Sequence, residues 1–167
     1  MTSVYGYSTP GDMSVFYPPS IPTEKSVEGT ILDYLYKDQN TRIFSYIVEK
    51  ANMQDKLSHI NFNSTLIVPL DKYLSRKYDE DYFVNMSPYD AYRIVNYSIL
   101  QSEISYPLLQ SVYYSALVPK NSYDRIESYT VSGVVTFNDT ITVIPMDVEC
   151  SNGRLLFIDD LLIPYNK

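Results

Sequence analysis

A turn near the C-terminal end of the sequence constrains the fold of this chain more than any other feature. The dipeptide Asn152-Gly153 separates two segments, 147–150 and 155–163, that both have the composition of β-strands. An Asn-Gly pair favours the positive φ angles that a tight hairpin turn requires. The second segment is apolar almost throughout and stops at Pro164. The sequence therefore predicts a β-hairpin close to the end of the chain.

A second constraint lies far upstream, in residues 64–74. The apolar run 66–68 has the composition of a buried strand. Pro69 cannot donate to the hydrogen-bond ladder of a central strand, so we expect the strand to stop there. Asp71 is predicted to cap the free amide groups of the helix that follows.

These two segments resemble the first and last signatures of the fasciclin-like domain family. Residues 94–100 are similar to the central strand of that family, although Ser98 stands where the family has a histidine. The receptor contacts attributed to this region in animal members are therefore not carried over. Ile67 and Tyr73 also depart from the usual aromatic and small residues of the first signature. The three segments follow the order of the family, and the resemblance covers residues 28–165.

The resemblance implies a wedge-shaped β-sandwich with short helices along one edge, and an adhesion or assembly module. Patterns along the chain agree, because helical signals come first and strands last, which favours an α+β fold. Helices are predicted at residues 30–37, 41–51, 53–57 and 87–94, the last running into a strand at 95–100. Short strands are predicted at 112–118, 127–131, 134–138, 140–144 and 155–163, with a turn at Asn138-Asp139. The predicted core residues are Leu66, Val68, Val95, Ile99, Val143, Leu156, Ile158 and Leu161.

Composition narrows the range of partners. The 167 residues carry a formal net charge of −7, which argues against nucleic acid, whose phosphates require a basic surface. No apolar run approaches membrane-spanning length, and the N-terminus lacks the basic start and apolar core of a signal peptide. We therefore expect cytosolic synthesis, no membrane insertion, and other protein chains as partners. The single cysteine, Cys150, is interpreted as a small buried core residue in a reducing compartment.

Residues 1–27 differ from the rest of the chain, which we assign to one domain, 28–167. Prolines and aromatic residues alternate here without helical or strand periodicity. Prolines fix φ and remove donors, so the segment is predicted to be an extended arm. Its aromatic rings can bury large areas against a partner protein, and the alternative is that the arm folds back on its own domain. The candidate partner-binding residues are Tyr5, Tyr7, Phe16 and Tyr17.

Signals for catalysis or metal binding are weak. His59 is the only histidine, and the acidic run 79–81 lacks the glycine turn of a calcium loop, so both are interpreted as solvated. Asp159 and Asp160 would point to opposite faces of a strand, and the resemblance implies a structural role for Asp159. We predict no catalytic residue, no cofactor and no metal. Four glycosylation sequons, interpreted as chance, begin at Asn63, Asn85, Asn96 and Asn138.

Tyrosine usage points to protein interfaces. The chain has 18 tyrosines and no tryptophan, and tyrosine is favoured where an apolar surface meets water. The hypothesis is a non-enzymatic assembly or cement component, such as a minor capsid protein of a large DNA virus, that docks through its arm and its tyrosine-rich surface. The alternative is an extracellular cell-adhesion module of the fasciclin type.

Overall fold

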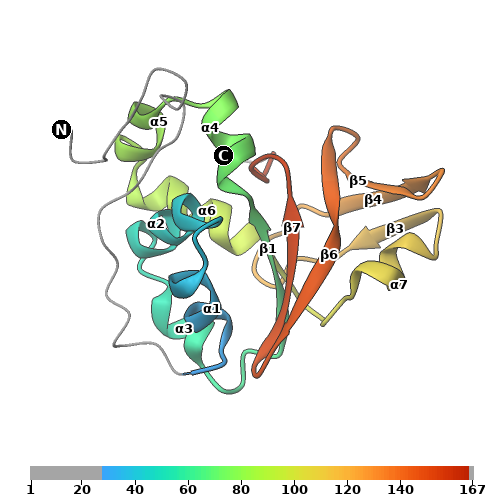
Figure 1. Cartoon of the computed structure of the whole chain (residues 1–167), viewed down its shortest axis with the longest axis horizontal. Coiled ribbons are helices and arrows are strands. Elements are labelled where there is room, and N and C mark those ends of the chain that lie inside the picture. The colour runs from blue at the N-terminus through green and yellow to red at the C-terminus, as the bar shows by residue number, and fades with distance from the viewer. Residues whose placement is uncertain (1–27, 166–167) are drawn as a thin grey trace.

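The computed structural model describes residues 28–165, in which helices come first and strands dominate the second half (Figure 1). The helices are α1 (Ile31–Lys37), α2 (Arg42–Lys50), α3 (Gln54–Ser58), α4 (Asp71–Lys77), α5 (Glu80–Val84), α6 (Pro88–Tyr97) and α7 (Tyr106–Gln110). The strands are β1 (Ser64–Pro69), β2 (Ile99–Leu100), β3 (Tyr114–Leu117), β4 (Ile126–Val131), β5 (Val134–Phe137), β6 (Ile141–Cys150) and β7 (Gly153–Ile158). Within this range no helix has the length and apolar character needed to cross a membrane.

The strands form one mixed sheet in the order β2-β1-β7-β6-β5-β4-β3. The β1–β7 pair is parallel and the other pairs are antiparallel. Strand β6 belongs to both halves, because its first residues pair with β5 and its later residues pair with β7. The register shifts between Val143 and Asp147, a stretch that contains Pro145. An irregularity of this kind lets one strand bend from one half of a sheet into the other.

Strands β1 and β7 are buried on both faces. Successive side chains of a strand point in opposite directions, so each strand contributes to two cores. One face contributes Leu66, Val68, Leu155 and Phe157 to the core beneath helices α1–α6. The other face contributes Ile67, Leu156 and Ile158 to a second core, together with Leu117, Ile126, Val135 and Phe137 from the opposite half of the sheet. The two halves of the sheet therefore face each other across the second core, which confirms the predicted wedge with helices at one edge. All eight predicted core residues are buried.

The predicted central strand at residues 95–100 is wrong for most of its length. Helix α6 continues to Tyr97, and only Ile99 and Leu100 form the short strand β2. The helix persists because Ala91, Ile94 and Val95 lie one turn apart and bury one helix face in the core. The same residues in isolation also fit a strand, and packing decides between the two.

Asp71 also caps a different helix from the one predicted. Helix α4 has no side-chain cap hydrogen bond at its start. Instead the amide groups of Arg42 and Ile43, at the start of α2, donate to the Asp71 carboxylate over 3.0 and 2.9 Å. The predicted α2 cap, Thr41, makes no such bond. Burial raises the pKa of Asp71 to about 6, because loss of solvation outweighs the two amide hydrogen bonds.

The β6–β7 hairpin forms as predicted, but not for the predicted reason. Neither Asn152 nor Gly153 has a positive φ angle. A Cβ atom on Gly153 would lie 2.3 Å from the Ser64 carbonyl oxygen, so the position needs glycine for space. Two other hairpin turns do have positive φ angles. They are the β5–β6 turn, at Asn138 (51°) and Asp139 (71°), where the sequence predicts a turn, and the β4–β5 turn, at Ser132 (53°) and Gly133 (79°).

Candidate partner-binding surface

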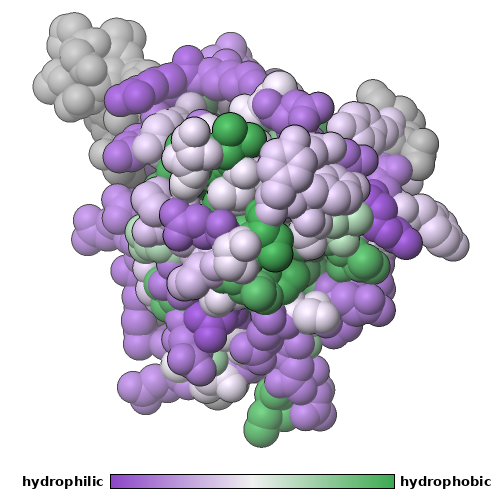
Figure 2. Space-filling model, turned by 90° about the vertical axis from the view of Figure 1, so that its right-hand side faces the viewer, coloured by the Kyte–Doolittle hydropathy of each residue, from purple (hydrophilic) through white to green (hydrophobic). Residues whose placement is uncertain are grey.

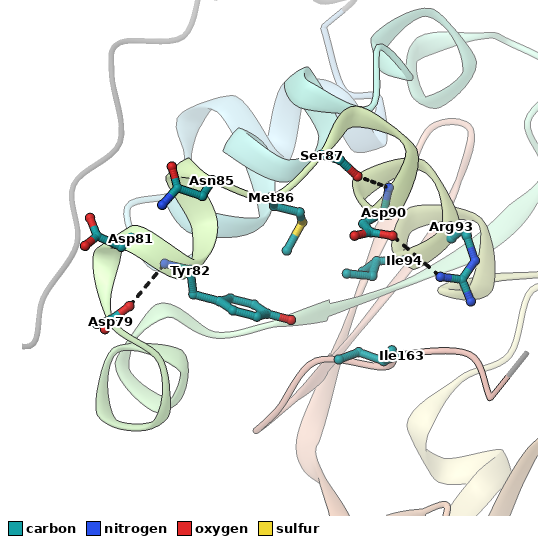
Figure 3. Close-up of a pocket in the computed structure, with 10 residues that line it drawn as sticks. All are labelled: Asp79, Asp81, Tyr82, Asn85, Met86, Ser87, Asp90, Arg93, Ile94 and Ile163. Carbon is teal, nitrogen blue, oxygen red and sulfur yellow. Dashed lines mark hydrogen bonds and ion pairs between the residues drawn. The ribbon is translucent and has the colours of Figure 1, made fainter. Parts of the chain in front are cut away.

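A cavity of about 720 Å³ lies between α5, α6 and the segment that follows β7 (Figure 3). Figure 3 shows the Tyr82 ring, Met86 and Ile94 directed toward the middle of this cavity, with Ile163 on the opposite side. We call it the α5–α6 groove. The remaining residues of its rim are polar: Asp79, Asp81, Asn85, Ser87, Asp90 and Arg93.

The polar rim follows from how the two helices begin. Asp79 is the N-cap of α5, and its carboxylate accepts from the Tyr82 amide over 3.1 Å. Ser87 is the N-cap of α6, and its hydroxyl accepts from the Asp90 amide over 3.0 Å. Residues 79–81 are exposed, as predicted, but they cap and start a helix and do not form a loop. Acidic side chains are favoured in a first helical turn by the amide dipoles, and two such turns meet at one rim.

Tyr82 is held by aromatic packing on its outer side. Its ring stacks on Tyr78 with the centroids 4.7 Å apart and meets Phe83 edge-on at 5.3 Å. The Tyr78 hydroxyl donates to Asp160 over 2.9 Å. Burial, together with the charges of nearby carboxylates, raises the pKa of both Tyr78 and Tyr82. The stacking on Tyr78 and the edge contact with Phe83 give the Tyr82 ring a defined place in the groove.

The charge of the rim is predominantly negative. Three carboxylates, Asp79, Asp81 and Asp90, face a single cation, Arg93. The Arg93 guanidinium lies 3.7 Å from the Asp90 carboxylate and 5.8 Å from the centre of the Tyr89 ring. Such an arrangement favours a basic ligand and disfavours an acidic one.

A second cavity of about 290 Å³ adjoins the first, because Arg93 lines both. Its walls include three exposed tyrosines, Tyr89, Tyr92 and Tyr123, and the last of these is 97% exposed. The sequence predicted a tyrosine-rich surface, and part of that surface lies beside the groove. The α5–α6 groove therefore has an apolar floor, formed by Tyr82, Met86, Ile94 and Ile163, and an acidic rim. A group of exposed tyrosines lies next to it.

Comparison with known proteins identifies the family. A model of the Fasciclin domain matches residues 39–164. The chain belongs to the fasciclin domain family. No curated protein matches this fasciclin domain by sequence.

A solved structure of a FAS1 domain pair from the insect cell adhesion molecule Fasciclin I matches with a TM-score of 0.66 and 21% sequence identity. The match covers 84% of this chain and 51% of that chain, so this chain spans about half the length of the domain pair. At this identity the likeness shows the fold, which confirms the predicted fasciclin-like architecture.

Other residues singled out in the sequence lie away from the groove. His59 is in an exposed loop, where its Nδ1 atom accepts from the Asn61 amide over 3.0 Å. Cys150 is half-buried against the helical core, and burial raises the pKa of its thiol to about 11, which disfavours the reactive thiolate. The Asp159 carboxylate accepts from the Thr142 amide over 2.9 Å, a structural role of the kind that the resemblance implied.

The candidate residues Tyr5, Tyr7, Phe16 and Tyr17 lie outside the described residues. Within residues 28–165, no group of three or more His, Cys, Asp or Glu side chains is placed to hold a metal ion.

Sequence reasoning missed most of the groove. The start of α6 carries a readable signal, Ser87 followed by Pro88 and Asp90. Nothing in the sequence indicates that Ile163 approaches Tyr82, because these residues are far apart in the chain and only the fold of this fasciclin domain brings them together.

Proposed function

We propose that this fasciclin domain is a non-enzymatic interaction module that binds other protein chains through the α5–α6 groove and the tyrosines beside it. The observation that carries the proposal is the combination of an apolar floor with a rim of three carboxylates and one guanidinium. The partner that fits this chemistry presents a protruding apolar side chain flanked by lysine or arginine.

The two parts of the groove have different tasks. Burying one leucine-sized side chain is worth about 1.5–3 kcal/mol, so the floor supplies most of the affinity. Exposed ion pairs are worth only about 0.2–1 kcal/mol each, so the rim mainly selects the partner and steers its approach. The expected interaction is accordingly weak for one domain and gains strength when several copies bind together.

The proposal is tested with short peptides in which leucine is flanked by lysines, and matched peptides with flanking glutamates. We expect the basic peptide to bind by fluorescence polarisation and the acidic peptide not to bind. Ile163→Asp places a charge on the floor at a residue that is 42% exposed, so it should leave the core intact. This variant should weaken binding at least about tenfold, the effect of roughly 1.4 kcal/mol.

Asp81→Asn combined with Asp90→Asn should weaken binding several-fold and reduce its salt dependence. Asp139→Asn, in the exposed β5–β6 turn, is the matched control and should bind like the wild type. Equal affinity for basic and acidic peptides, or full affinity in Ile163→Asp, would refute the groove as the binding site.

The more specific form of the proposal is an assembly or cement component, such as a minor capsid protein of a large DNA virus. Support comes from the exposed tyrosines of the domain and from the aromatic side chains of residues 1–27. In this form Tyr5, Tyr7, Phe16 and Tyr17 provide a second contact with the partner. Deletion of residues 1–25 should leave a folded domain by circular dichroism that is no longer incorporated into particles.

An unfolded truncated protein would instead show that residues 1–25 bind their own domain and stabilise it. Normal incorporation would leave the groove as the contact.

An extracellular adhesion module is the second candidate, because the matching domain pair comes from an insect cell adhesion molecule. Fractionation of the native source distinguishes the assembly proposal from the adhesion proposal. Copurification with particles supports assembly, and recovery from the cell surface supports adhesion.

A further inference from the structure

The second cavity, of about 290 Å³, is built on one face of helix α6. Tyr89, Tyr92, Arg93 and Asn96 line it, and their spacing of i, i+3, i+4 and i+7 places them on the same side of the helix. The loop 121–124 forms most of the remaining lining. We call this cavity the tyrosine pocket.

A buried amide holds the two walls of the tyrosine pocket together. Asn96 is only 4% exposed, and its Oδ1 atom accepts from Nδ2 of Asn121 over 3.4 Å. The Nδ2 atom of Asn96 donates to the Tyr92 carbonyl over 3.1 Å. Just after the loop, the Arg125 carbonyl accepts from the Tyr97 hydroxyl over 2.8 Å. The pocket is therefore preformed, and the Asn96 amide is already engaged in holding it.

The groups that the pocket presents to a ligand are mainly tyrosines. Tyr89, Tyr92 and Tyr123 are 63%, 47% and 97% exposed. Within residues 28–165 their hydroxyls have no hydrogen-bond partner. Each side chain therefore offers a flat apolar ring and a hydroxyl that can donate a hydrogen bond. These groups suit a ligand with flat apolar surfaces and unpaired carbonyl groups.

A polyproline II segment has this chemistry. It forms no internal hydrogen bonds, so its carbonyl groups need external donors, and aromatic-lined grooves are a common binding site for such segments. One turn of polyproline II rises about 9 Å. The distance along α6 from Tyr89 to Asn96 is similar, roughly 10 Å. Because the φ angle of proline is already fixed, such a segment loses little conformational entropy when it binds to a small site.

Charge connects the tyrosine pocket to the α5–α6 groove. Arg93 lines both cavities, so one extended segment can occupy both. The carboxylates of Asp79, Asp81 and Asp90 at the groove favour basic residues, whereas a run of prolines adds no charge. A single peptide with basic residues at one end and prolines at the other therefore complements both cavities.

We propose that the tyrosine pocket binds a proline-rich segment of the partner, continuous with the apolar residue and flanking basic residues that enter the α5–α6 groove. This inference rests on the proposed function, because the partner is the same. The ligand is thus a peptide in which a leucine-like residue between lysines or arginines adjoins a polyproline II run.

The opposite end of the molecule provides a control surface. Figure 2 faces the end that carries α7 and β3–β5, away from α5 (Figure 1), and hydrophobic side chains gather in the middle of this face. Tyr113, directly before β3, is 68% exposed. A peptide that only prefers exposed tyrosine and apolar surface would bind here as well as at the tyrosine pocket.

The proposal is tested on the full chain with three labelled peptides in fluorescence polarisation. The first is the lysine–leucine–lysine peptide, the second carries an added Pro-Pro-Ala-Pro run, and the third carries four added alanines. We expect the proline run to raise the affinity at least about tenfold over the alanine run. Tyr89→Leu and Tyr123→Leu change exposed residues of the pocket and should each remove most of this gain. Tyr113→Leu makes the same change on the control surface and should keep it.

The variant Ile163→Asp distinguishes this proposal from the proposed function. It should weaken all three peptides and leave the ratio between the proline and alanine peptides unchanged. If the groove is not a binding site, the unextended peptide does not bind, while the proline run still confers binding that Tyr123→Leu removes. If the tyrosine pocket is not a binding site, the unextended peptide binds and the proline run adds nothing.

Equal gains from the proline and alanine runs would overturn the proposal. A gain that persists in both Tyr89→Leu and Tyr123→Leu, or that only Tyr113→Leu removes, would overturn it as well. Displacement of the proline peptide by a neutral oligosaccharide such as maltohexaose would assign the pocket to carbohydrate and not to a proline-rich segment.

Discussion

The substitution Gly153→Ala separates two explanations for the same glycine. If Gly153 were needed for a positive φ angle, alanine at this position would have a strained backbone. The φ angle of Gly153, however, is not positive. At a compatible backbone angle, replacing glycine with alanine normally stabilises a protein by about 0.4–1 kcal/mol through the unfolded state. Conformational reasoning alone therefore predicts a more stable variant.

Packing predicts the opposite sign. The new Cβ atom would lie 2.3 Å from the Ser64 carbonyl oxygen and 2.9 Å from Cδ1 of Ile31. Gly153 and Ser64 are partners in the parallel β1–β7 pair, so the clash is with backbone at the first rung of that pair. Relief requires the two strands to separate locally by about 1 Å, and overpacking of this kind costs about 1–3 kcal/mol or more.

We expect a net destabilisation of about 2 kcal/mol and a drop in melting temperature of roughly 4–8 °C for a domain of this size. Urea unfolding and thermal melting followed by circular dichroism measure both quantities. Gly133→Ala is the control, because its Cβ would have open space, with Gln110 Nε2 at 3.8 Å, but its φ angle is +79°. This control should lose about 1 kcal/mol from backbone strain alone. A Gly153→Ala variant as stable as the wild type, or more stable, would refute the packing argument.

Two further predictions concern the core and its buried carboxylate. The pKa of Asp71 is raised from 3.8 to about 6 by folding, so its contribution to stability is fully present below about pH 4 and is lost as the pH rises through 6. The difference in unfolding free energy between wild type and Asp71→Asn should therefore fall by up to about 3 kcal/mol between pH 4 and pH 7, and a constant difference in urea titrations would contradict this. Leu156→Ala, in the core between the sheet halves, should cost about 2–5 kcal/mol, whereas Leu156→Met should cost less than about 1.5 kcal/mol; equal effects would show that the site is not tightly packed.

Local patterns were sufficient for the main elements of the fold. The apolar run 66–68 followed by Pro69 predicted β1 and its end, and the Asn-Gly dipeptide predicted the β6–β7 hairpin. Asn138 and Asp139 predicted a turn, and both have the positive φ angles of such turns. These features depend on neighbours within a few residues, so the sequence contains the information needed to predict them.

Helix α6 and Asp71 show where local reasoning stopped. Residues 95–97 are compatible with strand or helix, and the helix is selected because it buries Val95 in the core beneath the helices and Tyr97 in the second core. Asp71 is chemically suited to cap a helix, yet the helix it caps begins at Arg42, which packing brings to its side. Propensity describes what a residue can do, and tertiary contacts determine which partner it meets.

The sequence by itself determined the order of elements, the family and the surplus of tyrosine that indicates an interaction surface. Only the tertiary structure decided how the tyrosines and the groove residues lie relative to one another. The α5–α6 groove joins two helix starts to Ile163, with exposed tyrosines beside it. The groove depends on contacts between residues far apart in the chain, and such contacts follow from how the whole core packs and not from any local pattern.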